Sequence, residues 1–338
     1  MLRSCRCSRS SISASAPRRP RTGLPTACTP RRPDTRSSPS TGVVLPISRR
    51  SRSRLAGVPA LCALLACCSN AGSQPHLPPP APPPPPPSWT LVWSDEFTGP
   101  AGSRVDSTDW RYDLGDGCPN VCGWGNNEKE YYTSDTANIQ LNGQGQLQIV
   151  ARAAPPGLSC YYGPCRYTSA KITTRDKAPV SPGRVEARIK LAAGQGLWPA
   201  FWLLGTNIGT VGWPACGEMD IMENRGSQPT TTSSAVHGPG YSGNTPFAHA
   251  YAPVARDSFH VYAVEWNDQS IRFFVDGNEH YSVSRADVAR YGNWVFNQPY
   301  FVILNFAVGG NFDQDPQSDA IFPATMLVDY LRVYKPGP

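Results

Sequence analysis

Residues 183–191 read GRVEARIKL, and this stretch decides the fold class. Val185, Ala187 and Ile189 alternate with charged residues, which is the two-residue period of a β-strand with one buried face. Similar runs recur between clusters of Gly, Asn, Asp and Pro, at residues 147–152, 259–266, 270–277, 300–308 and 326–334. Only residues 284–291 are a candidate for a short helix. Many short strands without alternating helices predict an all-β fold, a sandwich of two antiparallel sheets.

The distribution of aromatic residues shows where this fold begins. All 9 Trp, 14 Tyr and 11 Phe lie within residues 89–338, and residues 1–88 contain none. A long segment rich in Arg, Ser and Pro that lacks aromatics does not build a packed core. We therefore expect one domain over residues 89–338. That part holds 18 basic and 24 acidic residues, so its net charge is negative and nucleic-acid binding is not expected.

The N-terminal segment has the pattern of an export signal. Residues 49–54 read RRSRSR and precede the apolar run LAGVPALCALLA, which is too short for a stop-transfer helix. The run ends at Cys67 and is similar to the lipobox of bacterial lipoproteins. Residues 49–68 thus predict either a lipidated cysteine, and membrane anchoring through it, or simple secretion. Residues 69–88 read as a proline-rich spacer. Residues 1–48 are either the product of a start codon assigned too far upstream or a disordered extension.

Five of the 11 cysteines fall in the predicted domain. Cys118 and Cys122 are close in sequence, as are Cys160 and Cys165, and both pairs lie among Gly and Pro. In an exported protein these spacings predict two local disulfides, Cys118–Cys122 and Cys160–Cys165, with Cys216 left free. A zinc site made of the four paired cysteines is the alternative, although the spacing is loose for it.

The segment GEMDIMENRG, residues 217–226, carries three carboxylates in six residues. On a strand, Glu218 and Asp220 share one face, and the apolar residues between them face the core. An unbroken strand would turn Glu223 into that core. One extra residue in a β-bulge restores Glu223 to the acidic face, so we predict a bulge at Ile221–Met222.

Three like charges on one face indicate a catalytic role of these residues more than a structural one. Two carboxylates across a glycosidic bond hydrolyse it, and a third shifts the pKa values of its neighbours. A calcium site or a solvated acidic edge would also explain the charges. Trp198 and Trp202 lie four residues apart just upstream, and Trp213 follows, so their rings are candidates to stack on sugars. The alternative is that these Trp belong to the core.

These residues resemble glycoside hydrolase family 16, and within it the bacterial laminarinase-type endo-1,3-β-glucanases. The resemblance covers residues 89–338 and rests on GEMDIMEN together with WSDEF, CGWGNNEKEYYT, YTSAKI, GRVEARIK, LWPAFWLL, HGPGYSG, YAVEW, IRFFVDG, LNFAVGGNF and VDYLRVY. It implies a jelly-roll sandwich, concanavalin-like, with a concave substrate cleft.

The resemblance also implies a reaction. Glu218 would be the nucleophile, Glu223 the general acid/base and Asp220 the assisting carboxylate in a retaining double displacement that needs no cofactor. The implied substrate is a 1,3-β-glucan such as laminarin, cleaved by a monomeric enzyme. Mixed-linkage glucan, agar or carrageenan specificity, transglycosylation, and a non-catalytic glucan-binding module are the alternatives.

Further roles carry over by motif position. Glu186 and Arg188 match residues that hydrogen-bond the sugar near the cleavage point. The donor side of the cleft is matched by Asn126, Trp198 and Trp202, and the leaving-group side by His237. Many family members bind a structural calcium, and its matching ligands here are Glu96, Gly143 and Asp329. Oxygen ligands of this kind suit calcium.

Overall fold

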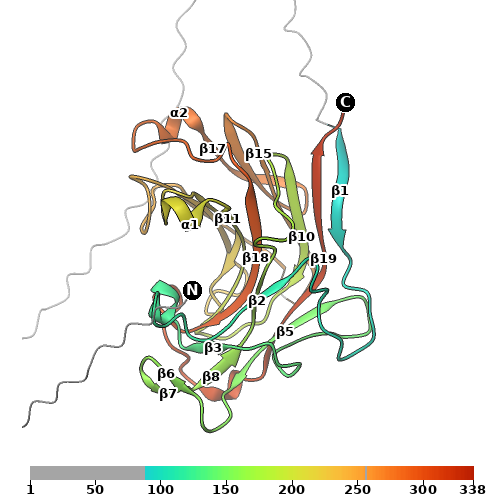
Figure 1. Ribbon diagram of the computed structural model, residues 1–338, viewed down its shortest axis with the longest axis vertical. Coiled ribbons are helices and arrows are strands. Elements are labelled where there is room, and N and C mark those ends of the chain that lie inside the picture. Colours follow the sequence, from blue (N-terminus) through green and yellow to red (C-terminus); the bar gives the residue numbers. More distant parts are fainter. Residues whose placement is uncertain (1–87, 256) are drawn as a thin grey trace, which may run out of the picture. The chain divides into compact units, whose positions relative to one another are not determined.

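A computed structural model describes residues 88–255 and 257–338, which form a sandwich of two sheets (Figure 1). The predicted extension 1–48, the signal-like segment 49–68 with Cys67, and residues 69–87 of the predicted spacer lie outside the described residues. Within the described ranges, no helix has the length and apolarity needed to cross a membrane.

The larger sheet has ten strands, and β10, from the stretch that predicted the fold, lies near its centre. Its main path runs β17 (Asn278–Ser284), β16 (Ser270–Val275), β15 (His260–Trp266), β10 (Arg184–Lys190), β19 (Ala324–Pro336), β5 (Leu147–Ala153), β8 (Tyr167–Ser169) and β3 (Glu130–Tyr132). Two further strands pair with this path, β1 (Trp89–Asp95) with β19 and β4 (Ile139–Leu141) with β5.

The second sheet has seven strands and carries the acidic segment on β12. Its order is β14 (Ala248–Tyr251), β13 (Thr232–His237), β12 (Glu218–Asn224), β11 (Leu197–Gly205), β18 (Tyr300–Val308), β9 (Lys171–Thr173) and β2 (Arg111–Asp113). All pairings in the two sheets are antiparallel except β3 with β8, which is parallel. All six strands expected from the sequence form, and the antiparallel sandwich is confirmed.

The remaining elements are short. A separate hairpin pairs β6 (Ser159–Cys160) with β7 (Gly163–Pro164). Helix α2 (Arg285–Val288) forms inside the expected 284–291 segment, where Ser284 and Asp287 make a capping box. Helix α1 (Ile208–Val211) was not predicted, and it lies between β11 and β12. The described residues also contain two short turns, η1 (Cys122–Gly125), in which Gly123 and Trp124 have left-handed backbone angles, and the 3₁₀ turn η2 (Asp319–Ile321).

The core lies between the two sheets. Val185, Ala187 and Ile189 on β10 are fully buried, as their alternation predicts, and Phe201 and Leu203 on β11 are buried in the same apolar cluster. Burial of one face of each strand supplies the main stabilisation of such a sandwich. The polar residues that alternate with this core therefore project from the two outer faces, away from each other.

Candidate active site

A β-bulge in β12 brings the three carboxylates to one face. Trp202 on β11 pairs with Asp220, but the next residue back, Phe201, pairs with Met222, so Ile221 is the extra residue. The pairing with β13 shifts over the same stretch, between Asp220 and Glu223. The predicted bulge at Ile221–Met222 is therefore confirmed. We call the outer surface of the seven-stranded sheet that bears Glu218, Asp220 and Glu223 the carboxylate face.

Tryptophan side chains hold the two outer carboxylates. The indole N–H of Trp213 donates to Glu218 at 2.8 Å, and that of Trp198 donates to Glu223 at 3.0 Å. Trp213 precedes β12 and is 48% exposed. Trp198 lies on β11 and stacks on Phe312, with ring centroids 4.8 Å apart. These predicted sugar-binding residues therefore lie beside the carboxylates and orient them.

His237 lies on the same face. It is the register partner of Glu218 on β13, and its Nε2 is 3.1 Å from Asp220 Oδ2 and 3.8 Å from Glu218 Oε1. The rings of His237 and Trp213 are 6.2 Å apart. The histidine that the sequence placed beside the leaving group is thus within the carboxylate cluster itself.

Burial raises the pKa values of all three carboxyl groups, and repulsion from Asp220 adds to this effect for Glu218 and Glu223. Loss of hydration, with repulsion from Asp220 second, raises the pKa of Glu218 to about 8. The same two causes raise the pKa of Glu223 to about 8, and burial raises the pKa of Asp220 to about 7. The groups titrate as one coupled unit. The cluster therefore retains protons at neutral pH, as a general acid requires.

Beyond the carboxylates, a polar network continues across the carboxylate face. The Trp202 indole donates to Asn305 on β18 at 2.7 Å, and the Asn305 amide donates to Tyr132 OH at 3.1 Å. Lys171 on β9 places its ammonium 4.2 Å from the ring centroid of Trp124 and 5.2 Å from that of Trp202. Trp202 thus shares the face with Trp198, as their spacing predicts.

Sequence reasoning missed part of this network. Trp124 and Tyr132 lie in one segment at residues 122–133, but Lys171 and Asn305 come from two others, and only the fold brings the three segments together. One signal was present, because a lysine inside the apolar strand pattern YTSAKI has no obvious place in a core. The predicted Asn126 follows η1, and its amide donates to Glu128 at 3.1 Å.

The prediction that Glu186 and Arg188 line the cleft was wrong. Both lie on β10 in the ten-stranded sheet, on the outer face opposite the core, whereas the carboxylates lie in the other sheet. Glu186 accepts hydrogen bonds from Arg184, and Arg188 pairs with Asp329 at 2.6 Å. Alternation along a strand shows which residues face away from the core, but it does not show to which of the two sheets the strand belongs.

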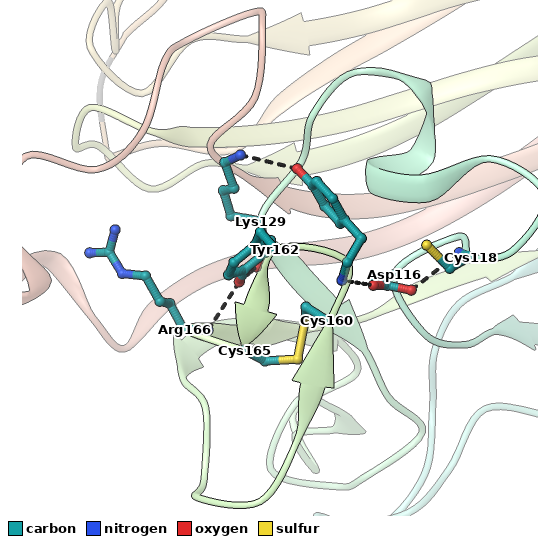
Figure 2. The surroundings of a disulfide bond; sticks show 8 residues. Asp116, Cys118, Lys129, Cys160, Tyr162, Cys165 and Arg166 are labelled. Atoms are coloured by element: carbon teal, nitrogen blue, oxygen red, sulfur yellow. Dashed lines mark hydrogen bonds between the residues drawn. A yellow bond between two sulfur atoms is a disulfide. The ribbon is translucent and has the colours of Figure 1, made fainter. Parts of the chain in front are cut away.

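Two disulfides close the loops near Asn126, as predicted from spacing: Cys118–Cys122 and Cys160–Cys165. Figure 2 shows the second of these beside Tyr162, Lys129 and Asp116. The Asp116 carboxylate accepts the backbone N–H groups of Cys118 and Tyr161 at 3.1 and 2.6 Å and so links the two loops. The four cysteines do not form the alternative zinc site. Cys216 is free and buried, and burial raises the pKa of its thiol to about 11.

The predicted calcium ligands are engaged by arginines. Glu96 binds Arg332 through two hydrogen bonds of 2.9 and 2.8 Å, and Asp329 binds Arg188. Two carboxylates and the carbonyl of Gly143 are oxygen donors of the kind that calcium prefers. An ion bound there competes with Arg332 for both oxygens of Glu96 and with Arg188 for Oδ2 of Asp329.

The fold and the carboxylate face together define a class of protein. A bulged strand that presents paired carboxylates beside tryptophan rings on the outer face of a two-sheet sandwich is the machinery of a glycoside hydrolase. The chain belongs to glycosyl hydrolase family 16, because the model of "Glycosyl hydrolases family 16" matches residues 122–330.

Individual relatives agree with this membership. A "Beta-glucanase" of Rhodothermus marinus is 39% identical over 257 residues, which cover 73% of this chain and 85% of that protein. The "Glucan endo-1,3-beta-glucosidase A1" of Niallia circulans is 36% identical over 264 residues, which cover 72% of this chain but 38% of that longer protein. The laminarinase catalytic domain of Thermotoga maritima is 42% identical with a TM-score of 0.69, and the match covers 74% of this chain and 99% of that one. The predicted jelly-roll sandwich is thereby confirmed.

Proposed function

We propose that the chain is a retaining endo-1,3-β-glucanase that cleaves laminarin-like polysaccharide. The observation that carries the proposal is the bulge in β12, which places Glu218, Asp220 and Glu223 on one face with indole N–H donors on the two outer groups. Relatives named laminarinase and glucan endo-1,3-beta-glucosidase support the choice of linkage.

The roles follow from the surroundings of each carboxyl group. Glu223 has a pKa of about 8, so it holds a proton at neutral pH and gives it to the leaving oxygen. Glu218 shares a hydrogen bond with Asp220. As Glu218 attacks the anomeric carbon, the proton of this hydrogen bond passes to Asp220, and the bond to the leaving oxygen breaks while Glu223 protonates that oxygen.

The second half of the reaction reverses these roles. Glu223, now ionised, takes a proton from water, and the resulting hydroxide displaces Glu218 from the anomeric carbon. Two inversions at that carbon give net retention. The Trp213 N–H supports Glu218 as its charge returns. Trp198, Trp202 and Asn126 are proposed to bind the donor-side sugars, and His237 and Trp213 the leaving-group side.

The test is a product profile on laminarin, lichenan, agarose and carrageenan with wild type, Glu218→Ala and a control, Glu186→Gln. Glu186 is a buried glutamate of the other sheet. We expect wild type and the control to release oligosaccharides fastest from laminarin, with the β-anomer formed first, and Glu218→Ala to lose at least about 10³-fold in rate. Equal rates for wild type and Glu218→Ala refute the catalytic role. Preference for agarose or carrageenan refutes the substrate, and binding without turnover by wild type indicates a glucan-binding module.

We also propose that the enzyme is exported. Two disulfides fit an extracellular protein, and the signal-like pattern of residues 49–68 supports the same location. Mass spectrometry of the mature N-terminus separates the two forms, because a diacylglycerol on Cys67 marks a lipoprotein and an unmodified N-terminus marks free secretion.

Structural calcium remains a further proposal. Its support is the oxygen donor set of Glu96, Gly143 and Asp329, with both carboxylates on or next to strands that pair with each other. We expect calcium to raise the melting temperature of wild type and not that of Glu96→Gln. An equal rise in melting temperature for wild type and Glu96→Gln contradicts the calcium site.

A further inference from the structure

Glu130 on β3 is a buried carboxyl group with one unpartnered oxygen. The residue has no exposed surface, and its Oε2 accepts the backbone N–H of Val308 at 2.7 Å. Its Oε1 is buried and has no hydrogen-bond partner among the described residues. The neighbouring polar group is the carboxyl of Glu128, which is 5% exposed. An ionised Glu130 would therefore present a bare anionic oxygen to another carboxylate.

Hydrogen-bond donors distinguish the two glutamates. Glu128 accepts from the Asn126 amide at 3.1 Å and from Tyr132 OH at 3.4 Å, and Lys171 attracts its charge. Glu130 accepts the Val308 N–H through Oε2, while its Oε1 has no hydrogen-bond partner in the part of the chain that the structure describes. Because two adjacent buried carboxylates do not both ionise, a single negative charge belongs on Glu128 and a proton on Glu130. That proton turns the unpartnered Oε1 into a donor to Glu128.

We propose that Glu130 is a protonated carboxylic acid that donates to Glu128, and that this pair positions the donor-side wall of the substrate site. Glu128 holds Asn126 directly. On its other side, Tyr132 connects the pair to Asn305, which accepts from the indole of Trp202. Trp202 in turn pairs with Asp220 on the neighbouring strand. Glu130 and Glu128 are positioning residues, since they act on the sugar through other side chains.

The other charged and titratable groups around the pair agree with this assignment. Burial, and then the charge of Glu128, raise the pKa of Glu130 well above its usual range. Burial, and then the charges of both glutamates, raise the pKa of Tyr132, so its hydroxyl stays neutral. Lys171 is the cation that attracts the charge of Glu128, and its ammonium also lies 3.8 Å from Asp113. Tyr162 lies further out, and its hydroxyl donates to the backbone carbonyl of Lys129.

The inference deepens the proposed function, on which its activity readouts rest. Loss of the proton at alkaline pH puts a second charge beside Glu128 and loosens Asn126 and Trp202. We therefore expect KM for laminarin to rise with pH in wild type, in addition to any change in kcat from the catalytic carboxyls.

The experiment compares wild type with Glu130→Gln, Glu130→Ala and the control Glu186→Gln. Glutamine keeps the shape of the acid and a neutral donor, so Glu130→Gln should keep KM within about twofold at pH 6 and lose the alkaline rise in KM. Alanine removes the donor, so Glu130→Ala should raise KM about tenfold with kcat changed less than threefold. Glu186→Gln should retain the wild-type pH dependence of KM.

A spectroscopic readout is independent of turnover and of whether Glu130→Ala folds. The infrared difference between wild type and Glu130→Gln at pH 7 should contain the carbonyl band of a protonated carboxyl group. For Glu186→Gln, whose carboxylate pairs with Arg184, the difference should contain a carboxylate band. A carboxylate band for Glu130, or an alkaline rise in KM that survives in Glu130→Gln, overturns the inference. If no protein degrades laminarin while the protonated band is present, the proposed function fails and the protonation state stands.

Discussion

Replacing the general acid Glu223 by glutamine should inactivate the enzyme and stabilise the fold. Burial and repulsion from Asp220 raise the pKa of Glu223 from the ordinary 4.5 to about 8. The native state therefore holds a proton that the unfolded chain releases, and stability falls as pH rises from about 4.5 to about 8. At pH 7 the difference of 2.5 units is worth about 3 kcal/mol, at 1.36 kcal/mol per unit. Glutamine is neutral at every pH and keeps an oxygen for the Trp198 N–H.

The measurement is urea or thermal unfolding of wild type and Glu223→Gln at several pH values between 4 and 8. We expect no difference near pH 4 and a gain for Glu223→Gln of about 3 kcal/mol at pH 7, or roughly 6–12 °C in melting temperature. Because repulsion within the cluster is shared, this is an upper value. Laminarin hydrolysis should fall by about 10²–10⁴-fold. If the free energies of unfolding of wild type and Glu223→Gln differ by the same amount at every pH, Glu223 does not have a raised pKa in the folded state, and the reasoning is refuted.

Three further predictions concern a carboxylate-binding tryptophan, one disulfide and the bulge in β12. Trp198→Phe removes the N–H that stabilises ionised Glu223, so the alkaline limb of the pH–rate profile should move to higher pH; a shift to lower pH contradicts this role. Removing the Cys160–Cys165 disulfide with two serines should lower the free energy of unfolding by about 2 kcal/mol, measured by urea unfolding, because the closed loop is short. Deleting the bulge residue Ile221 leaves the flanking pairs in register, so circular dichroism should show a folded domain, about 3 kcal/mol less stable and with Glu223 still on the carboxylate face.

The sequence predicted the strands and the bulge because both depend on local alternation. Val185, Ala187 and Ile189 identify a strand without knowledge of its neighbours, and three acids separated by one and then two residues fit one face only with an extra residue. Disulfides between cysteines four and five positions apart are equally local.

Assignments that depend on strand order could not be made from alternation. Glu186 and Arg188 have the outward pattern of cleft residues but lie in the ten-stranded sheet, far in sequence and in strand order from β12. Lys171 and Asn305 meet Trp202 only because β9, β18 and β11 are neighbours. Long-range pairing places these residues, and a single sequence carries little direct signal of it.

The pairing of β12 on both sides explains why repulsion from Asp220 adds to burial in raising the pKa values of Glu218 and Glu223. Glu218 pairs with Leu204 and His237 on its two neighbouring strands, and Asp220 pairs with Trp202 and with a residue of β13, so backbone hydrogen bonds set their spacing. Side chains on a loop could separate and keep their charges. On a central strand they cannot separate, so the cluster reduces its repulsion by keeping a proton. The same proton is the one that a general acid must hold at neutral pH, and the sheet therefore contributes directly to the chemistry.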